Sequence, residues 1–423
     1  MDYDKKMSST KASPCFSDNG FRKNLICEIY VFIMIFILII VNSGMSDVSA
    51  NENTTMSLSR LELLKQELIN VSEGTKSVIL SPDGSRAYSI NLEGMSVYEI
   101  DRATRKILRK LNFVPHPGKG FNYDKDVWID SYQEKPVEAC FTHDARFLWI
   151  SLHNADGIVV WDLQNNDTYI EGKAFKEAWL HERVIESPSD SNSNIQNNTE
   201  NFDRRKVRLL WIKTGKTPKI VTSSTDGKYL FVSNWHSNTV SVLDIASSDK
   251  KDWMKLRDLK TGRIPRGLAV SPDSNYLYVA QMGGSEINVV DLITFQKVKT
   301  INVGRNPRHI VVAGDFMYVS LNMLAKLVKI DLTADTLVKS AKTGRTPRTI
   351  ALTKDKTIIF VVSYRGDALQ AFSTEDLKFL GSWKSSVHPV GVDVYQDSDL
   401  LEVWVANYSS GTIRIFTFKK LPG

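Results

Sequence analysis

Basic side chains recur at the end of a repeated phrase in this chain and could together bind an anion. The phrase reads Gly, a basic residue, any residue, Pro and then Lys or Arg, and it occurs four times. Its last residues are Lys219, Arg266, Arg308 and Arg348, and Lys76 takes the same position when the repeats are aligned. Arg presents a planar fork of N–H donors that matches carboxylate or phosphate oxygens. The sequence therefore predicts an anion site, to which each charge-assisted bond would contribute about 1.5 to 3 kcal/mol.

The phrase also has an architectural use that needs no ligand. Gly permits a tight turn, and Pro fixes φ at the start of a strand. Cations about 10 Å apart in water repel by only about 0.4 kcal/mol, so solvated or blade-bracing cations could persist unoccupied. The aligned positions of two further repeats hold Val137 and Val390, so the cations form an asymmetric arc. The sequence leaves two interpretations of the arc open: a ligand site, or solvated or blade-bracing cations.

Aromatic and histidine side chains lie on turns that we expect to face the same side as the arc. The ligand candidates on these turns are Trp235, His236, Tyr364 and Tyr408. Aromatic rings beside arginines suit sugars, nucleotides or aromatic acids, and packing over the turn is the alternative. His309 is a candidate acid or base, with a structural hydrogen bond as the alternative. No residue is assigned a catalytic role.

The spacing of the phrase predicts the fold that positions these residues. The four prolines are 47, 42 and 40 residues apart, a period typical of repeat arrays. Each phrase precedes alternating runs of β-branched and aromatic residues that are broken by turns. Four strands in each repeat of about 42 residues predict an all-β propeller with four-stranded antiparallel blades.

The clearest repeat contains Tyr229-Leu230-Phe231-Val232-Ser233-Asn234, and Thr239-Val240-Ser241-Val242-Leu243-Asp244 follows it after a turn. This text resembles the YVTN-family β-propeller repeat, and the resemblance covers most of the chain after the N-terminal segment. It implies an exported or cell-surface propeller and does not define a function.

Counting the repeats predicts seven blades within residues 51–423, which we expect to form a single propeller. The seventh repeat ends after three strands at Phe418, and residues 61–71 could supply its fourth strand. That pairing would close the ring and remove an exposed sheet edge. Alternatively, Leu61, Leu64 and Leu68 could form one face of a helix. The blades are expected at 74–113, 135–213, 214–260, 261–303, 304–342, 343–384 and 385–418.

Two insertions interrupt the repeats, at residues 114–134 and 168–205. The first is aromatic enough to pack as a lid, and the second contains a polar Ser/Asn/Asp run that we expect to be exposed. Asp124, Asp126 and Asp130 fail the calcium-loop pattern, so no metal site is predicted. Cys140 lies on an apolar strand and is predicted to be a buried thiol rather than a nucleophile.

Residues 1–50 are predicted to be a signal peptide or an N-terminal anchor. Basic residues precede an apolar run at 29–41, and small residues follow at Val48-Ser49-Ala50. The run is short for a bilayer span, so cleavage is favoured, while an uncleaved anchor would contact the membrane through residues 29–41. Either reading predicts an exported, periplasmic, cell-surface or secreted protein.

The sequence favours a binding or scaffold propeller over an enzyme. Its formal net charge of +6 favours an anionic ligand, a cell-envelope polymer or an acidic partner protein. Nucleic acid is disfavoured because nothing in the pattern is shaped for a groove. The alternative is a lactonase-like or quinoprotein-dehydrogenase-like enzyme, for which His236, Arg308 and His309 are weak candidates. No cofactor is predicted.

Overall fold

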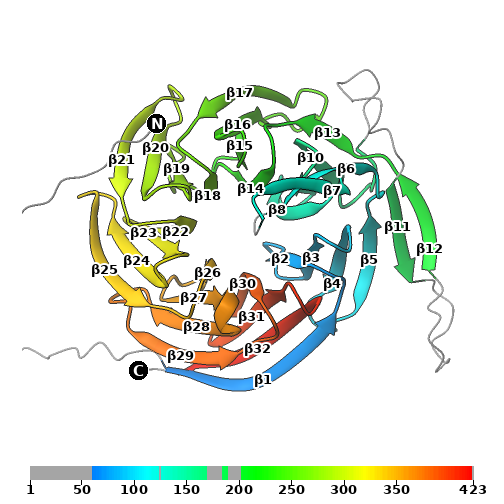
Figure 1. The fold of residues 1–423 in the computed structure, drawn as a ribbon. Coiled ribbons are helices and arrows are strands. Elements are labelled where there is room, and N and C mark those ends of the chain that lie inside the picture. The colour runs from blue at the N-terminus through cyan, green and yellow to red at the C-terminus, as the bar shows by residue number, and fades with distance from the viewer. Residues whose placement is uncertain (1–59, 123–124, 169–182, 189–201, 422–423) are drawn as a thin grey trace, which may run out of the picture. The chain divides into compact units, whose positions relative to one another are not determined.

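The computed structural model describes residues 60–122, 125–168, 183–188 and 202–421. Seven antiparallel sheets surround a common centre and form a propeller (Figure 1). The part of the chain from Ser57 to Gly423 is one compact unit. The prediction of a seven-bladed propeller of four-stranded antiparallel sheets is confirmed. The expected leader and its apolar run lie outside the described residues.

The first three blades are formed by the following strands. Blade one contains β2 (Thr75–Leu80), β3 (Arg86–Asn91), β4 (Ser96–Asp101) and β5 (Ile107–Asn112). Blade two contains β8 (Pro136–Thr142), β9 (Phe147–Leu152), β10 (Gly157–Asp162) and β13 (Leu210–Lys213). Blade three contains β14 (Pro218–Ser223), β15 (Tyr229–Asn234), β16 (Thr239–Asp244) and β17 (Met254–Lys260).

The remaining blades repeat the same order from the centre outward. Blade four contains β18 (Pro265–Val270), β19 (Tyr276–Gln281), β20 (Glu286–Asp291) and β21 (Lys297–Asn302). Blade five contains β22 (Pro307–Ala313), β23 (Phe316–Leu321), β24 (Lys326–Asp331) and β25 (Thr336–Lys342). Blade six contains β26 (Pro347–Leu352), β27 (Ile358–Ser363), the 3-10 turn η2 (Tyr364–Gly366), β28 (Ala368–Ser373) and β29 (Phe379–Lys384).

Blade seven joins the two ends of the described chain. It contains β30 (Pro389–Asp397), β31 (Leu400–Asn407), β32 (Thr412–Leu421) and, at its outer edge, β1 (Arg60–Asn70). Leu61 pairs with Lys420 and Asn70 pairs with Thr412, so β1 runs along nearly the whole of β32. The predicted closing strand is therefore confirmed, and the helical alternative for these leucines is wrong.

The core lies between neighbouring blades because the middle strands bury both of their faces. All six residues of β9 and all six of β10 are buried, which explains why both strands have nearly continuous apolar sequences. The outer strands are more exposed to solvent, and β25 exposes six of its seven residues. Apolar clusters cross blade boundaries, as where Tyr278 of blade four packs with Val319 of blade five. Burial against two neighbours holds each blade in place.

The two insertions build hairpins at different places. The first forms β6 (Pro117–Asn122) and β7 (Val127–Tyr132), which pair only with each other. The described part of the second forms β11 (Arg183–Pro188) and β12 (Phe202–Val207). These strands extend blade one, because β11 pairs with β5 and makes a six-stranded sheet. The second insertion interrupts blade two in sequence and adds to blade one in space.

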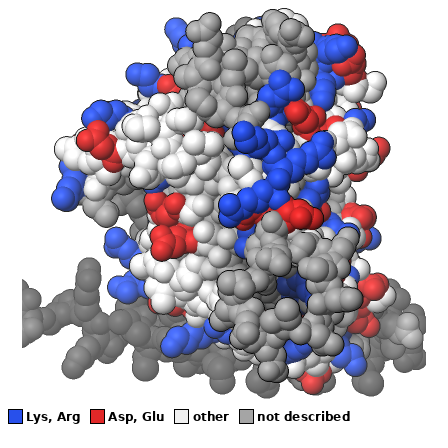
Figure 2. Space-filling model, turned by 90° about the vertical axis from the view of Figure 1, so that its right-hand side faces the viewer, with Lys and Arg blue, Asp and Glu red and all other residues white. Residues whose placement is uncertain are grey.

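The outer edge of this six-stranded sheet is strongly charged. Arg204, Arg205 and Lys206 are exposed on β12, and Figure 2 shows Lys and Arg side chains gathered on this side of the molecule. Charged side chains on an edge strand oppose pairing with another chain. The fully buried Arg183–Glu134 ion pair, 2.6 Å long, ties β11 to the segment that precedes β8.

The described residues contain no membrane-spanning helix and one cysteine, Cys140. Within the described residues, none of the helical turns is long and apolar enough to cross a membrane. Cys140 lies on β8, and burial raises the pKa of its thiol to about 12. That direction disfavours the thiolate, which is the reactive form of cysteine.

Candidate functional site

The loops that carry the repeated phrase are held in one strained conformation. The residue before each Pro has a positive φ at Thr217, Ile264, Asn306, Thr346 and His388, although none of these is Gly. A non-glycine residue rarely adopts this conformation, which costs about 1 to 3 kcal/mol and persists only where the surrounding structure enforces it.

A hydrogen bond repeated around the ring enforces the strained loops. The carbonyl of Thr217 accepts the N–H of Trp235 at 3.1 Å, and the carbonyl of Thr346 accepts the N–H of Tyr364 at 3.0 Å. Equivalent bonds join Ile264 to Met282, Asn306 to Asn322 and His388 to Tyr408. Each phrase is therefore fixed to the turn after the second strand of its own blade, and the next Lys or Arg leaves the backbone in a set direction.

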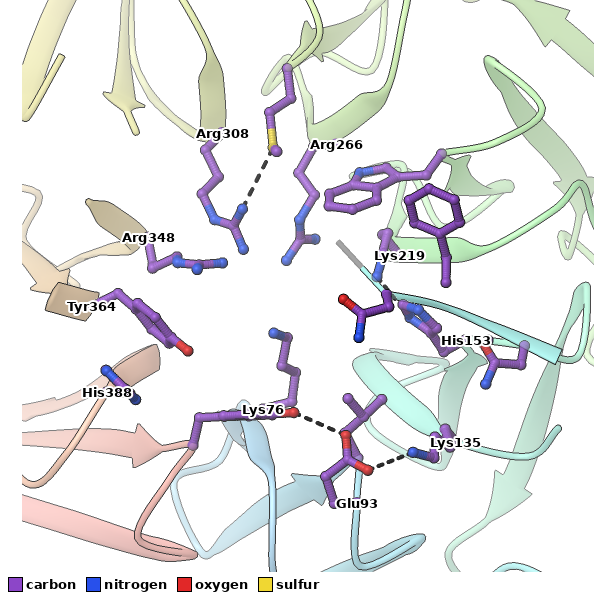
Figure 3. A pocket seen from close by; sticks show the side chains of 18 of the residues that line it. Lys76, Glu93, Lys135, His153, Lys219, Arg266, Arg308, Arg348, Tyr364 and His388 are labelled. Atoms are coloured by element: carbon purple, nitrogen blue, oxygen red, sulfur yellow. Dashed lines mark hydrogen bonds and ion pairs between the residues drawn. The ribbon is translucent and has the colours of Figure 1, made fainter. Parts of the chain in front are cut away.

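The cationic side chains point into one cavity at the centre of the ring. The cavity has a volume of about 770 Å³. Figure 3 shows the ends of Arg266, Arg308, Arg348, Lys76 and Lys219 turned toward its middle from five different blades. Lys135 and Arg365 also line it, and Glu93 is the only carboxylate among the described lining residues. The wall is therefore strongly positive.

Three of these cations are almost completely shielded from water. Lys219 is 4% exposed, Arg266 is 3% exposed and Arg308 is 4% exposed, while Lys76 and Arg348 are half-buried. The solvated rim that the sequence left open does not describe these side chains. Two unit charges 10 Å apart repel by about 1.7 kcal/mol at an effective dielectric near 20, against about 0.4 kcal/mol in water. Burial makes the clustering costly.

The two carboxylates near the cavity are already engaged. Glu138 accepts a bond from Arg266 Nη2 at 3.0 Å. Glu93 accepts bonds from Lys135 at 2.5 Å and from the Tyr408 hydroxyl at 2.9 Å. Nε and Nη1 of Arg266 and Nε of Arg348 are buried without a hydrogen-bond partner among the described residues. Buried donors of this kind are rare in folded proteins and call for an explanation.

Aromatic rings support several of the cations. The Lys219 amine lies 4.3 Å from the centre of the Trp235 ring, and the Arg348 guanidinium lies 4.1 Å from that of Tyr364. Tyr364 in turn stacks on His388 with the ring centroids 4.3 Å apart. Cation–π contacts of this kind favour a desolvated cation by up to about 2 kcal/mol and leave its N–H donors available.

The β6–β7 hairpin lies at the cavity and contributes Gly120, Phe121, Asn122, Ile129 and Ser131 to its lining. The Phe121 ring lies 4.8 Å and the Trp128 ring 5.2 Å from the ring of His236. His236 also contacts Thr217 Oγ1 through Nδ1 at 2.7 Å. The hairpin therefore rests on blade three, and His236 supports it rather than lining the cavity, while its role as a lid stays a prediction.

The charges of the cavity perturb one another. Burial, followed by Arg348, Arg308 and Arg266, lowers the pKa of Lys76 well below its ordinary value. Burial, followed by Arg266, Lys76 and Arg308, does the same to the pKa of Lys219. Burial is also the main cause that lowers the pKa of Arg348, to about 10, so this guanidinium stays charged at neutral pH.

Most of the predicted site residues meet at the cavity. Eight of the nine line the cavity, namely Lys76, Lys219, Arg266, Arg308, Arg348, Trp235, Tyr364 and Tyr408. His236 lies beneath the hairpin. His309 is absent from the described lining, and burial lowers its pKa to about 4. Their role in binding stays a prediction.

Sequence reasoning missed the groups that limit the positive charge of the cavity. Glu138 follows Val137, in one of the two blades that lack the repeated cation, and it pairs with Arg266 across the ring. Glu93 and Lys135 were also missed as cavity residues. His153 Nδ1 lies 2.7 Å from Lys219 Nζ. The available signal was the turn after the second strand, where His153 takes the place that Trp235 has in blade three and Glu93 takes the place of His236.

Among the described residues no group of three His, Cys, Asp or Glu side chains could hold a metal ion. Residues 211–296 match the family model described as lactonase, 7-bladed β-propeller. That match covers blade three and part of blade four, and it supports a propeller family. No curated protein matches the chain. The narrower YVTN assignment stays a prediction.

Two solved structures are similar to this chain in fold. The hydrazine synthase of Kuenenia stuttgartiensis has a TM-score of 0.60 and 16% identity, over 88% of this chain and 98% of that one. The β-propeller domain of Cps50 (Swd1) from Myceliophteria thermophila has a TM-score of 0.59 and 10% identity, over 83% of this chain and 99% of that one. At such low identity the likeness shows the fold alone.

Proposed function

We propose that the central cavity binds a small molecule, or the end of a chain, that carries two or more carboxylate or phosphate groups. One observation carries the proposal. Arg266, Arg308, Arg348, Lys76 and Lys219 converge on a cavity whose described carboxylates are already bonded to other groups. A folded chain gains nothing by gathering buried like charges, whereas an anion would satisfy their open donors.

The shape of the site supports a small ligand over a flat partner surface. A volume of about 770 Å³ falls in the usual range for small-molecule pockets. The β6–β7 hairpin forms part of the cavity wall. A polymer or an acidic protein segment, the other predicted partners, would have to insert a free end or a narrow loop.

The aromatic residues of the cavity wall restrict the class of ligand further. Trp235, Tyr364 and Tyr408 line the cavity beside the cations and offer faces for a sugar or another ring. The favoured ligand is therefore an anion with a cyclic part. We also propose that the protein acts outside the cytoplasm, on the strength of the predicted signal peptide at residues 1–50.

The proposal is tested by calorimetric titration with tripolyphosphate and citrate, with acetate as a monovalent control. The polyanions should bind with a stoichiometry near one and weaken as salt is raised, and acetate should not bind measurably. Arg308→Gln combined with Arg348→Gln removes two charge-assisted bonds, so polyanion binding should weaken by roughly 10² to 10⁴-fold. Equal binding by the double variant would overturn the proposal.

The family-model match favours a second candidate, hydrolysis of an anionic lactone. Residues 211–296 include Lys219, Trp235 and Arg266, three residues of the cavity wall. His153, which bonds to Lys219, would be the group placed to activate water. Acid release from a panel of sugar-acid lactones tests this candidate, and a rate equal to that without protein would exclude it for those lactones.

A further inference from the structure

One amine in the cavity stands apart from the other cations. Lys76 leaves β2 and extends its amine toward the middle of the cavity, facing Arg308 and Arg348 (Figure 3). Lys219 differs because its amine is bonded to His153 at 2.7 Å. The Lys76 amine makes no hydrogen bond or ion pair with any described residue, and it lies 5.0 Å from the centre of the Tyr408 ring.

The surroundings of this amine oppose its protonated form. An ammonium on this half-buried side chain would lie beside three guanidinium groups, whose repulsion Glu138 offsets only in part, and no carboxylate of the described chain is bonded to it. The cost of such a charge is relieved most simply by losing the proton. A neutral amine has a free lone pair, and burial beside other cations is a known way to make lysine nucleophilic.

We infer that Lys76 captures small aldehydes or ketones that carry an anionic group, by forming an imine at its Nζ while Arg266, Arg308 and Arg348 hold the anion. This inference rests on the proposed anion site and adds a covalent chemistry to it. The anion would enter as the ligand of the guanidinium groups, and its carbonyl carbon would come within reach of the amine. The chemical class is a phosphorylated aldehyde or an oxo acid.

The step balances without any redox partner. The nitrogen lone pair of Lys76 forms a bond to the carbonyl carbon, and the carbonyl π bond breaks toward oxygen to give a carbinolamine. The oxygen then leaves as water with the two hydrogens that the amine carried, and a C=N bond remains. Tyr408 and Glu93, joined by a 2.9 Å hydrogen bond beside the amine, are placed to pass the protons.

Pyridoxal 5′-phosphate is a suitable probe because it carries an aldehyde and a phosphate on one small ring. The full-length protein is incubated with the probe at neutral pH, reduced with borohydride and mapped by peptide mass spectrometry. Lys76 should be the main labelled lysine. Exposed lysines such as Lys216 should be labelled mainly at alkaline pH, since an unperturbed amine has a pKa near 10.4.

Three controls separate anion recognition from amine reactivity. Pyridoxal, which lacks the phosphate, should label Lys76 at least about tenfold less, the loss expected from one charge-assisted bond. Excess tripolyphosphate should protect Lys76 and leave the labelling of exposed lysines unchanged. Arg308→Gln should also reduce labelling, because it removes an anchor for the phosphate and a cation that keeps the amine neutral.

The outcomes distinguish this inference from the proposed function. Labelling spread evenly over exposed lysines, or concentrated on Lys219, would overturn the role of Lys76. If tripolyphosphate binds in calorimetry and Lys76 is still not labelled, the anion site stands and the imine fails. If tripolyphosphate does not bind and Lys76 is not labelled, both fail. Because labelling is measured on the unmodified protein, no variant has to fold for the test to count.

Discussion

The two faces of the propeller both repeat a charge at equivalent positions, and they use it differently. Successive turns of an up-and-down blade alternate between the faces. The phrase loops and the turns after the second strands share the cavity face, and the turns after the first and third strands lie on the opposite face. Lys and Arg repeat on the cavity face, whereas Asp repeats on the opposite face.

The repeated aspartates are explained by their own turns. Asp226 accepts bonds from Ser224 Oγ at 2.6 Å and from the N–H of Lys228 at 3.1 Å. Asp291 accepts the N–H groups of Ile293 and Thr294. Short polar side chains commonly close turns in this way, so these repeated carboxylates require no ligand.

Cations on the opposite face also have partners. Arg105 bonds to Glu67 at 3.1 Å and to Glu402 at 2.8 Å, which links β1 to its neighbours where the ring closes. Arg308, on the cavity face, donates from Nη1 to Met282 Sδ at 3.5 Å, a weak acceptor. A repeated charge that is satisfied locally indicates structure. A repeated charge that is buried with open donors is what the proposed ligand would explain.

The largest expected effect comes from opening the ring, because both faces depend on it. Removing residues 51–72 deletes β1, uncovers β32 and takes Glu67 away from Arg105. We expect the whole propeller to lose stability and to melt broadly at a much lower temperature, measured by circular dichroism. A truncated protein as stable as the full chain would refute closure by this strand.

A smaller loss of stability is expected from Arg105→Met. This variant removes one of the two arginines bonded to the buried Glu402. Because Arg102 remains 3.0 Å away, the loss should fall below the roughly 3 to 5 kcal/mol typical of breaking a buried ion pair. Denaturant unfolding should detect the loss, while tripolyphosphate affinity should stay unchanged. Lys228→Met, at an exposed pair with Asp226, is the matched control and should change stability little. Equal losses in the two variants would remove the distinction between them.

The Asp turns should each contribute modestly and in a pH-dependent way. Asp273→Ala removes the bonds from Ser271 and from the N–H of Asn275, a loss of about 1 to 2 kcal/mol at neutral pH. The bond from Ser271 is the first cause that lowers the pKa of Asp273, so its contribution is present above pH ~4 and is lost as acid protonates the group. Unfolding at neutral and acidic pH checks this, and a difference that grows in acid would contradict it.

The smallest expected effect is proton uptake on anion binding. Burial and neighbouring cations lower the pKa of Lys76 and Lys219, and a bound anion should raise both again. Binding should therefore take up a fraction of a proton at neutral pH and weaken as pH rises. Titrations in two buffers of different ionisation enthalpy measure this uptake. Proton release on binding would have the wrong sign.

Much of this fold could be predicted from the sequence because its signals are local and repeated. The phrase fixed the positions of Pro218 and its equivalents, and the third strand of blade seven implied a missing partner that β1 supplies. The insertion at residues 168–205 could not be placed, because β11 pairs with β5 of another blade and no local pattern marks that contact.

The sequence predicted which residues form the candidate site, but not how deeply their side chains are buried or what they contact. Alignment identified Lys76, Lys219, Arg266, Arg308 and Arg348, but side-chain burial depends on the width of the channel and on the hairpin beside it. Glu138 could not be identified for the same reason, since blade three separates its blade from that of Arg266 and the pair forms only in the folded ring. The cationic side chains lose contact with water only when the ring has closed around them.

The most direct test of the central claim, that the inner cations serve a ligand and not the fold, is a comparison of melting temperatures. The unmodified protein and the variant with Arg308→Gln and Arg348→Gln are melted with and without tripolyphosphate. Without the anion the variant should melt at or above the temperature of the unmodified protein, because buried repulsion has been removed. The anion should raise the melting temperature of the unmodified protein alone. A variant that melts lower without the anion, and that responds to the anion as fully as the unmodified protein, would contradict the claim.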